Sequence, residues 1–439
     1  MSINVLVADD SAYLRKSIAD ILKDHELINV LEFAKNGEEA VALTKKIHPD
    51  VLVLDLVMPK MNGLEAFKLI MEEIPTPTVI LSAISPKNLD SSIQALLMGA
   101  FDYIIKPGGI GAKELPRFRE ELLAKVLLAS QSQIKKLFRK EGESIRQNVP
   151  LRQEIIDEIF DFGLYLNRLQ PIQESQKEVN PLIIDIGKTK IEPSKQTQFI
   201  KERKAKDLDT LEDKIVKPKI STKINLQKPI TRSDTTVAPN LTPVRDILID
   251  SNVIVIGASV GGPRTITTIL KELPANLSAP ILIVQHLSSH FTEAFVDNLD
   301  IECNLRIKIA ENGESLLPGI CYIAPGDNHM VIDIANKRPY IKIYKGKPVN
   351  FCMPSIDLLF FSAARIYRKR AMGIILTGMG SDGVEGLGAI KKLGGHTIAE
   401  SEETSILYAM PKFAAEKGYV HQILPNHEIY QEIINFLSK

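Results

Sequence analysis

The sequence predicts two α/β domains joined by a long linker, and three observations carry this prediction. Short apolar runs alternate with amphipathic stretches over residues 1–128 and again over residues 251–439. The runs are too short for helices and too uniformly apolar for half-exposed strands, which is typical of buried parallel sheets. Residues 129–250 lose this pattern. A chain of 439 residues is also too long for one ordinary core.

The composition is that of a globular protein without an overall electrostatic bias. Hydrophobic residues make up 44%, charged residues make up 25%, and the formal net charge is zero. We therefore expect no general attraction to nucleic acid or anionic lipid. Cys303, Cys321 and Cys352 are odd in number and far apart, which predicts reduced core residues. The sequence shows no leader and no long apolar span, so a cytoplasmic protein without membrane insertion is expected.

The first 130 residues alternate between strand and helix patterns in a doubly wound, flavodoxin-like order. Strands are expected within residues 3–10, 30–37, 49–59, 76–85 and 101–109. Helices are expected within residues 13–25, 38–48, 63–73, 91–100 and 114–129. This is a five-stranded parallel sheet with five helices.

Residues 129–250 predict a linker in two parts. "LRQEIIDEIFDFGLYLNRL" has a helical periodicity, so residues 131–170 are expected to be partly helical. After Gln170 the sequence is rich in Lys, Thr, Ser and Pro with isolated apolar residues, which predicts disorder. The lysines leave open a nucleic-acid or membrane patch, but the interspersed acidic residues favour a solvated tether.

From Ser251 the alternation returns and predicts a second parallel α/β domain. Strands are expected within residues 252–257, 279–286, 371–380 and 395–401. Helices are expected within residues 264–274, 291–299, 356–367 and 383–394. A β-rich insertion from Arg306 to Tyr344 interrupts the order.

Polar residues that close the apolar runs of the first domain predict a phosphorylation site. Asp9 and Asp10 follow the first run, Asp55 the third, Ser82 the fourth and Lys106 the fifth. The carboxyl ends of parallel strands meet at one sheet edge, where three carboxylates repel one another unless a cation such as Mg²⁺ shares the site. We expect Asp55 to be the nucleophile, while Lys106 and Ser82 hold the phosphoryl oxygens. Taken singly, each residue could instead cap a helix or mark a turn.

The first domain also carries a family resemblance. "ADD", "LDLVMPKMNG", "LSA" and "IIKP" resemble, in order and spacing, the receiver domain of bacterial two-component response regulators over residues 1–128. The resemblance implies phosphoryl transfer from a histidine kinase onto Asp55, with Mg²⁺ as the cofactor. It places Tyr103 at the aromatic switch position, where Tyr103 and Ser82 would report phosphorylation. A core aromatic is the alternative for Tyr103.

The stretch "VIVIGASVGGPRTI" carries the candidate nucleophile of the second domain. Gly257 to Gly261 fits G-x-S-x-G, in which Ser259 sits on a sharp strand-to-helix turn. Pro263 suits the first turn of the next helix, whose free amides would lie close to the serine. That geometry serves an oxyanion in acyl transfer and a bound phosphate equally well, so a non-catalytic anion cradle is the alternative. A dinucleotide-binding site is a less favoured interpretation, because the glycines do not form the motif G-x-G-x-x-G.

A serine nucleophile needs a histidine base that a carboxylate orients. The histidines of this half are His286, His290, His329, His396, His421 and His427. His286 closes the strand after the serine and is expected at the same sheet edge, and Asp382 follows a later strand in a glycine-rich loop. A rival set of Ser259, Asp382 and His396 has the α/β-hydrolase order, but in that fold the serine follows several strands. Taken singly, His286 could be a structural hydrogen-bonder and Asp382 an Asx turn or helix cap.

A second resemblance covers residues 251–439. "IGASVGGP", "VQHLSSHFTEAF", "PGICYIAPGDNHM", "PSIDLLFFSAA" and "ILTGMGSDGVEGLGAIKKLGG" resemble the catalytic domain of the chemotaxis protein-glutamate methylesterases. The resemblance implies that Ser259 is the nucleophile, His286 the general base and acid, and Asp382 its orienting partner. It places Met379 in the active-site loop.

The same resemblance implies a substrate class. A phosphorylation-activated hydrolase would demethylate glutamate methyl esters of chemoreceptors in chemotaxis adaptation, release methanol, and deamidate receptor glutamines, without a cofactor for hydrolysis. No nucleic-acid partner is expected, because no helix-turn-helix with a basic face is evident. Two departures stand out: Val260 replaces the usual threonine, leaving only its N–H as an oxyanion donor, and the linker is far longer than usual.

Overall fold

The computed structural model describes residues 2–83, 85–107, 115–138 and 251–438. The long segment 139–250, which holds most of the expected linker, lies outside the described residues. Of the stretch expected to be partly helical, residues 131–138 fall inside them, and they contain the short helix α6 (Ile134–Leu137). Across the described ranges, none of the helices combines the length and the apolarity that a membrane span requires.

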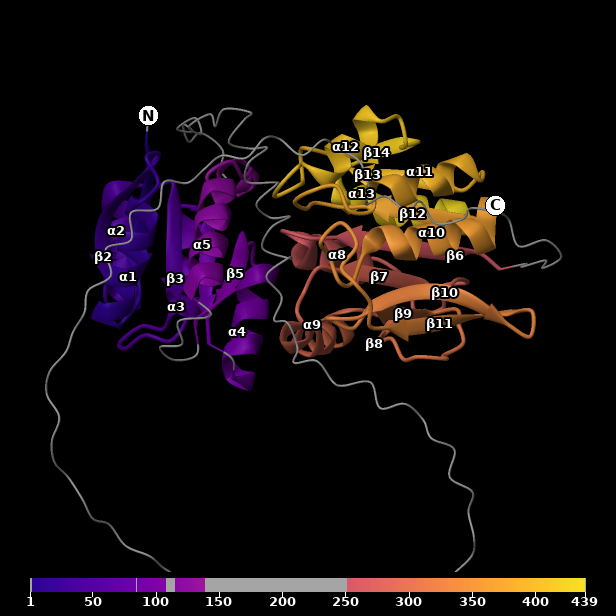
Figure 1. Ribbon diagram of the computed structural model, residues 1–439, viewed down its shortest axis with the longest axis horizontal. Helices are drawn as coiled ribbons and strands as arrows, with labels where there is room; N and C mark the ends of the chain where they lie inside the picture. The colour runs from indigo at the N-terminus through magenta and orange to yellow at the C-terminus, as the bar shows by residue number, and fades with distance from the viewer. Residues whose placement is uncertain (1, 84, 108–114, 139–250, 439) are drawn as a thin grey trace, which may run out of the picture. The chain divides into compact units, whose positions relative to one another are not determined.

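Within its described residues, the first domain is a five-stranded parallel sheet in the order β2-β1-β3-β4-β5, as the sequence predicts (Figure 1). The strands are β1 (Ile3–Ala8), β2 (Ile28–Ala34), β3 (Val51–Asp55), β4 (Thr78–Ser82) and β5 (Asp102–Ile105). The helices are α1 (Ala12–Lys23), α2 (Gly37–Ile47), α3 (Gly63–Glu73), α4 (Pro86–Leu97) and α5 (Leu115–Ala129). Helix α1 packs against α5, and α3 packs against both α2 and α4.

The strand order decides where the acidic residues lie. Strands β3 and β4 are buried along their whole length, which is expected where helices cover both faces of a sheet. Strand β1 pairs in parallel with β3, so the residue that follows β1 and the last residue of β3 share one edge. Asp9 and Asp55 are thereby brought together.

Residues 251–438 are all described and form a seven-stranded parallel sheet in the order β14-β13-β12-β6-β7-β9-β8, with a separate antiparallel hairpin β10-β11. The strands are β6 (Val253–Ala258), β7 (Ile281–Gln285), β8 (Arg306–Ile309), β9 (Ile320–Ile323), β10 (His329–Ala335), β11 (Arg338–Tyr344), β12 (Ala371–Ile375), β13 (His396–Glu400) and β14 (Gln422–Leu424). The β-rich insertion thus divides: β8 and β9 join the parallel sheet, and β10 and β11 make the hairpin.

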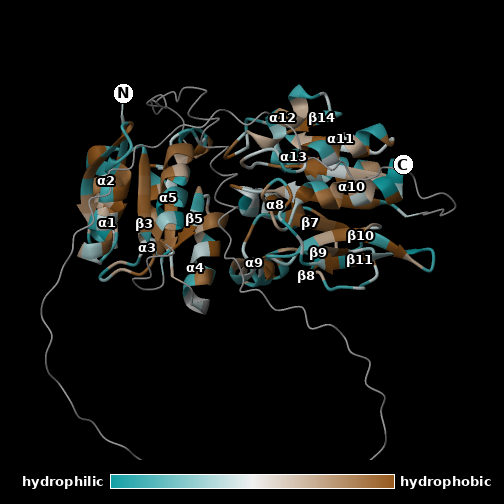
Figure 2. Ribbon diagram, viewed as in Figure 1, coloured by the Kyte–Doolittle hydropathy of each residue, from teal (hydrophilic) through white to brown (hydrophobic). Residues whose placement is uncertain are grey.

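Helices pack against one another on this sheet. They are α8 (Gly262–Lys271), α9 (Ser289–Glu302), α10 (Ile356–Tyr367), α11 (Val384–Lys392), α12 (Met410–Glu416) and α13 (Asn426–Leu437), with a short 3₁₀ turn η2 (Arg368–Arg370). Helix α8 packs against α9 and α13, whereas α10 packs against α11 and the hairpin. Figure 2 shows the strands as mostly hydrophobic and the helices as mixed.

The central strand β6 is buried along its whole length between two clusters of apolar side chains. Ile254 and Ile256 belong to one cluster, and Val253 and Val255 belong to the other. Side chains of a strand alternate between its faces, so an uninterrupted run of branched apolar residues fills both cores. Ser259, the polar residue that follows this run, therefore lies at the C-terminal edge of the sheet.

Candidate active site

Ser259 stands on a tight turn between β6 and α8. Its N–H donates to the Thr377 carbonyl at 3.0 Å, and the Gly262 N–H donates to the Ser259 carbonyl at 2.9 Å. Gly261 has a φ of 78°, in the left-handed region that favours glycine. At Gly257 a Cβ atom would lie only 2.2 Å from the Ile356 side chain. The small residues of the motif are therefore required by the turn and by close packing.

Three neighbouring strands present the three candidate catalytic residues. Strand β6 pairs with β12 on one side and with β7 on the other. Ser259 follows β6, His286 follows β7, and Asp382 lies in the loop after β12. The His286 N–H donates to the Ala258 carbonyl at 3.1 Å, which fixes the end of β7 against the end of β6.

His286 and Asp382 form a hydrogen-bonded pair. His286 Nε2 lies 3.0 Å from Asp382 Oδ2, and Asp382 is buried. The Ser355 hydroxyl donates to Asp382 at 2.9 Å and the Ile356 N–H donates at 2.6 Å. Burial alone would raise the pKa of Asp382, but the hydrogen bond and charge of His286 and the Ile356 N–H outweigh it, so the pKa is lowered. A carboxylate is thus stabilised in the interior.

The other nitrogen of His286 faces a thiol. Nδ1 lies 3.7 Å from Cys352 Sγ. Burial by itself would lower the pKa of His286 and raises that of Cys352. A thiol with a raised pKa is protonated and uncharged near neutral pH, so it does not attract the imidazolium. The negative charge that raises the pKa of His286 near neutral pH is therefore that of Asp382. The sequence predicts Cys303, Cys321 and Cys352 as reduced core residues. All three are free thiols, but Cys321 alone of the three is buried, whereas Cys303 and Cys352 are partly exposed.

Ser259 and His286 are neighbours along the sheet edge without a direct bond. Over the described residues, no hydrogen bond joins the Ser259 hydroxyl to the imidazole. Catalytic hydrogen bonds are often absent or long before substrate binds and form in the complex.

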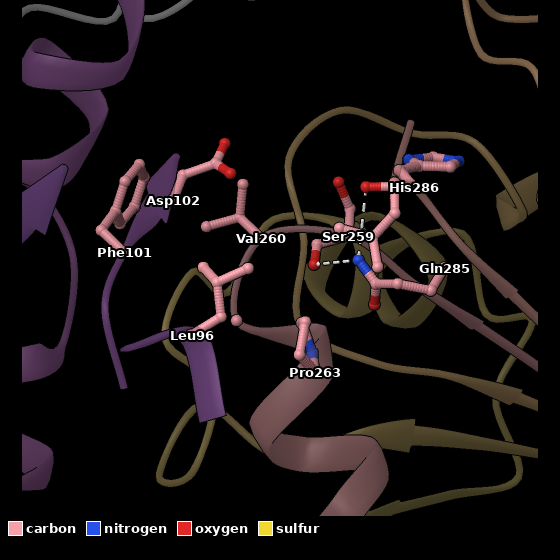
Figure 3. A pocket seen from close by; sticks show the side chains of 10 residues that line it. Leu96, Phe101, Asp102, Ser259, Val260, Pro263, Gln285 and His286 are labelled. Carbon is pink, nitrogen blue, oxygen red and sulfur yellow. Dashed lines mark hydrogen bonds between the residues drawn. The ribbon is translucent and has the colours of Figure 1, made fainter. Parts of the chain in front are cut away.

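Gln285 is a site residue that the sequence reasoning missed. Its side-chain amide donates to the Ser259 carbonyl at 2.8 Å and lies 3.4 Å from the His286 carbonyl (Figure 3). Gln285 is 3% exposed, so this bond is shielded from water. The sequence did contain a signal for this role, because Gln285 is a polar residue at the end of an otherwise apolar strand.

Backbone donors suitable for an oxyanion lie beside the serine. Among the described residues, the Val260 N–H donates to no other group. The Val260 carbonyl accepts a hydrogen bond from the Thr377 hydroxyl at 2.9 Å, which ties the turn to the loop that carries Met379. Met379 is partly buried in that loop. A Cβ on Gly378 would lie 2.7 Å from Ser259 Cβ, so the loop approaches the serine closely.

Asn350 and Asp357 complete the polar network and were also missed. The Asn350 side-chain amide donates to Asp357 at 2.5 Å and to Asp382 at 3.1 Å. Burial and the charge of Asp382 raise the pKa of Asp357 to about 8. Two buried carboxyls this close share one negative charge. Asp382 carries that charge and Asp357 holds the proton.

The rival base His396 lies at the wrong edge of the sheet. His396 is the first residue of β13, whereas Ser259 follows the last residue of β6. The strands between them are paired in parallel, so the two residues are at opposite edges. His396 lies 3.3 Å from Glu432 instead.

The acidic cluster of the first domain surrounds a lysine. Lys106 Nζ lies 2.7 Å from a carboxylate oxygen of Asp9 and 2.7 Å from one of Asp55. Burial raises the pKa of Asp55, and Lys106 opposes that shift. Oxygens of Asp9, Asp10 and Asp55 all lie within 4.8 Å of one another. A set of carboxylate oxygens at this spacing fits a hard cation such as Mg²⁺.

The two expected reporters of phosphorylation occupy different surroundings. The Ser92 hydroxyl donates to the Ser82 hydroxyl at 2.9 Å, which ties β4 to α4. The Tyr103 ring lies 3.8 Å from that of Phe291, and its hydroxyl lies 3.4 Å from the Ser288 hydroxyl. Tyr103 is therefore buried, but at its hydroxyl end it contacts the segment that follows His286.

A small cavity lies in front of the serine. Its volume is about 30 Å³, which is room for about two water molecules. Leu96, Phe101 and Asp102 line it opposite Ser259, Val260 and His286 (Figure 3). Residues 96, 101 and 102 of the first domain therefore form one wall of the space next to the serine.

Comparison with known proteins gives two family matches. Residues 254–433 match the CheB methylesterase family, and residues 5–115 match the response regulator receiver domain. A protein-glutamate methylesterase/protein-glutamine glutaminase of Archaeoglobus fulgidus is 33% identical over 434 residues, covering 99% of this chain and 98% of the relative. Its namesake in Thermotoga maritima is 31% identical over 435 residues, with the same coverage of both chains.

One solved structure is similar to the second domain alone. The CheB methylesterase catalytic domain of Thermotoga maritima is 39% identical, covers 43% of this chain and 99% of its own, and has a TM-score of 0.42. The similarity to the full-length relatives spans both domains and the segment between them. The chain belongs to the family of CheB-type protein-glutamate methylesterases/protein-glutamine glutaminases with an N-terminal receiver domain.

Proposed function

We propose that residues 251–439 hydrolyse γ-glutamyl methyl esters of chemoreceptors and that residues 1–128 control this activity through phosphorylation of Asp55. The observation that carries the proposal is the buried hydrogen bond of 3.0 Å between His286 and Asp382, next to Ser259 on the adjoining strand. Among the described residues, this is where a serine, an imidazole and a carboxylate follow three neighbouring strands. Membership of the methylesterase family supports this substrate class.

The steps of the reaction follow from these groups. His286 takes the proton of Ser259, and the serine oxygen bonds to the ester carbonyl carbon. The Val260 N–H and the loop around Met379 stabilise the oxyanion, for which one donor is typically worth about 10²–10³-fold in rate. Methanol leaves with the proton from His286. Water then donates a proton to His286, its oxygen bonds to the acyl carbon, and Ser259 departs with the proton.

Asp382 acts through the imidazole. Because its carboxylate accepts a hydrogen bond from Nε2, the other nitrogen is free of a proton in the neutral ring and serves as the base. The negative charge also stabilises the imidazolium that forms. The same steps with ammonia as the leaving group would deamidate receptor glutamines.

The receiver site supports phosphoryl transfer from a histidine kinase. An Asp55 oxygen bonds to phosphorus as the phosphoryl group leaves the kinase histidine. Lys106 and Ser82 then hold the phosphoryl oxygens, with Asp9, Asp10 and Asp55 as the ligands for Mg²⁺. A bound Mg²⁺ ion supplies neutralising charge for those oxygens.

Control follows from the contacts around Tyr103 and the cavity. In the unphosphorylated chain, Leu96, Phe101 and Asp102 close the space in front of Ser259. Phosphorylation draws Ser82 toward the phosphoryl group and away from Ser92, and Tyr103 leaves Ser288. We propose that this opens the cleft to the receptor. Deleting residues 1–128 should therefore raise the basal rate; an unchanged rate would contradict occlusion.

The test is methanol release from methylated receptor, with and without a small phosphodonor such as acetyl phosphate. Release should rise with the phosphodonor in the wild type, and the rise should vanish in Asp55→Asn. Ser259→Ala should release no methanol above background while Asp55 is still phosphorylated. Turnover near the wild-type rate in Ser259→Ala would rule out the assignment.

A non-catalytic anion cradle is the alternative, because the turn before α8 offers backbone N–H groups to a phosphate as readily as to an oxyanion. A fluorophosphonate probe separates the two. An esterase is labelled at Ser259, and labelling falls in His286→Ala; a cradle is not labelled in either protein.

A further inference from the structure

The part of the active site that hydrolysis does not use is the thiol of Cys352. Its sulfur lies 3.7 Å from His286 Nδ1, on the opposite side of the ring from Asp382. The ligand atoms of His286, Cys352 and Asp382 all lie within 4.8 Å of one another. Hydrolysis as described above needs a histidine and a carboxylate, and the thiol has no part in it.

The spacing of sulfur and nitrogen suits a shared metal ion. In a tetrahedral Zn²⁺ site with Zn–S of about 2.3 Å and Zn–N of about 2.0–2.1 Å, the two ligand atoms are roughly 3.6 Å apart. The observed separation of 3.7 Å is close to this value. Asp382 already accepts a hydrogen bond from Nε2. A carboxylate on the second nitrogen is the usual partner of a metal-bound histidine, because it fixes the ring and makes the ligating nitrogen more basic.

Charge and access also favour a cation. Asp382 carries a negative charge in the interior next to the ring, and no lysine or arginine is bonded to it among the described residues. His286 is 16% exposed in its side chain and lines the small cavity of Figure 3. Cys352 is partly exposed as well. Neither residue is therefore fully buried.

We propose that Cys352 Sγ and His286 Nδ1 bind one thiophilic divalent cation, of which Zn²⁺ is the type, and that the ion reversibly stops hydrolysis by occupying the catalytic imidazole. Binding replaces the thiol proton by the metal and releases that proton, and any proton on Nδ1, to solvent. Nothing is oxidised or reduced. The lone pair of Nδ1 then points at the metal and no longer accepts the proton of Ser259. Inhibition rests on the proposed role of His286, whereas binding does not.

The experiment measures binding and inhibition separately on the full chain. Cd²⁺ is added as the probe for binding, because a cadmium–thiolate bond absorbs in the ultraviolet. Protection of each cysteine from iodoacetamide by Zn²⁺ is mapped by mass spectrometry. Inhibition is the Zn²⁺ concentration that halves methanol release, followed by recovery with a chelator. Cys303→Ser is the matched control, since Cys303 is also a partly exposed free thiol.

The expected results are specific to one thiol. Zn²⁺ protects Cys352 but not Cys303, and Cd²⁺ gives a thiolate band in the wild type and in Cys303→Ser but not in Cys352→Ser. The inhibitory Zn²⁺ concentration rises by about tenfold or more in Cys352→Ser, in line with the loss of a metal-site partner. If the serine variant is unstable, Cys352→Ala replaces it in these measurements, and thermal unfolding checks that the variant is folded.

Two results would overturn the proposal. One is an unprotected Cys352 with no thiolate band in the wild type. The other is equal inhibition of the wild type and the Cys352 variants. If the wild type released no methanol at all, the proposed esterase function would fail, and protection and absorbance would still decide whether the metal binds.

Discussion

Asp382 lies 3.0 Å from His286 Nε2 and is 2% exposed. Its carboxylate also accepts hydrogen bonds from Ser355 and from the N–H of Ile356, at the first residue of α10. A helix N-terminus stabilises a negative charge through its free N–H groups and its dipole. The charge next to the candidate base is therefore stabilised by the Ser355 hydroxyl and by the N-terminus of α10.

Replacing Asp382 or Asp357 by Asn should reveal the different roles of the two carboxyl groups. Asp382→Asn removes the charge that orients His286 and should reduce kcat by about 10⁴-fold, as loss of the orienting carboxylate does in serine hydrolases. Asp357→Asn should cost about tenfold or less, because Asp357 is already protonated at pH 7 and one weakened hydrogen bond from Asn350 is the main loss. Methanol release under saturating receptor measures both. Equal losses in the two variants would contradict this division of charge.

Gln285 should affect the rate without taking part in the chemistry. Gln285→Ala removes the bond of 2.8 Å to the Ser259 carbonyl and frees the turn that positions the nucleophile. Small displacements of a nucleophile cost up to about 10²-fold, so we expect kcat to fall by about 10–100-fold with little change in KM. Gln431→Ala, on the exposed side of α13, is the matched control and should keep wild-type kinetics.

Glu400 should make stability depend on pH in a defined direction. The Thr377 N–H and the hydroxyls of Thr404 and Thr265 donate to its buried carboxylate, yet burial raises the pKa of Glu400 to about 7. Between about pH 4.5 and pH 7 the folded chain keeps a proton that the unfolded chain has lost. The stabilising effect of that proton is complete below about pH 4.5 and is lost as the pH rises through about 7.

The variant Glu400→Gln isolates this effect. An amide cannot ionise, so the free energy of unfolding of the variant relative to the wild type should rise with pH by roughly 3 kcal/mol across that window. Urea unfolding of both proteins at a series of pH values gives the difference. A difference that does not change with pH would show that Glu400 does not titrate there.

Removal of divalent metal should affect one domain and not the other. With a chelator present, Asp55 should no longer be phosphorylated by acetyl phosphate, because the three acidic side chains need a cation to accept a further anion. Basal methanol release should persist. Asp10→Asn should weaken Mg²⁺ binding and so raise the Mg²⁺ concentration at half-maximal phosphorylation, whereas Asp20→Asn, on α1 outside the cluster, should leave that concentration unchanged.

Much of this architecture is encoded locally. Runs such as "VLVLD" and "VIVIGA" are buried throughout, so hydrophobic pattern alone predicts parallel strands, and residues that follow such strands must meet at one sheet edge. That rule predicts the cluster around Asp55 and the candidacy of Ser259 and His286. The same rule excludes His396 only after the strand bounds are known, because His396 then turns out to begin its strand and so lies at the opposite edge from the serine.

Other features depend on which strands and loops are neighbours, and only the tertiary structure decides these. Asn350 and Asp357 are separated from Asp382 in sequence, and no local period marks them. Cys352 has an apolar context in the chain and reads as a core residue, yet the fold of the loop before α10 places its sulfur against His286. Periodicity reports whether a side chain is buried, whereas the identity of its neighbour depends on strand order and loop path, which are set by packing over the whole domain.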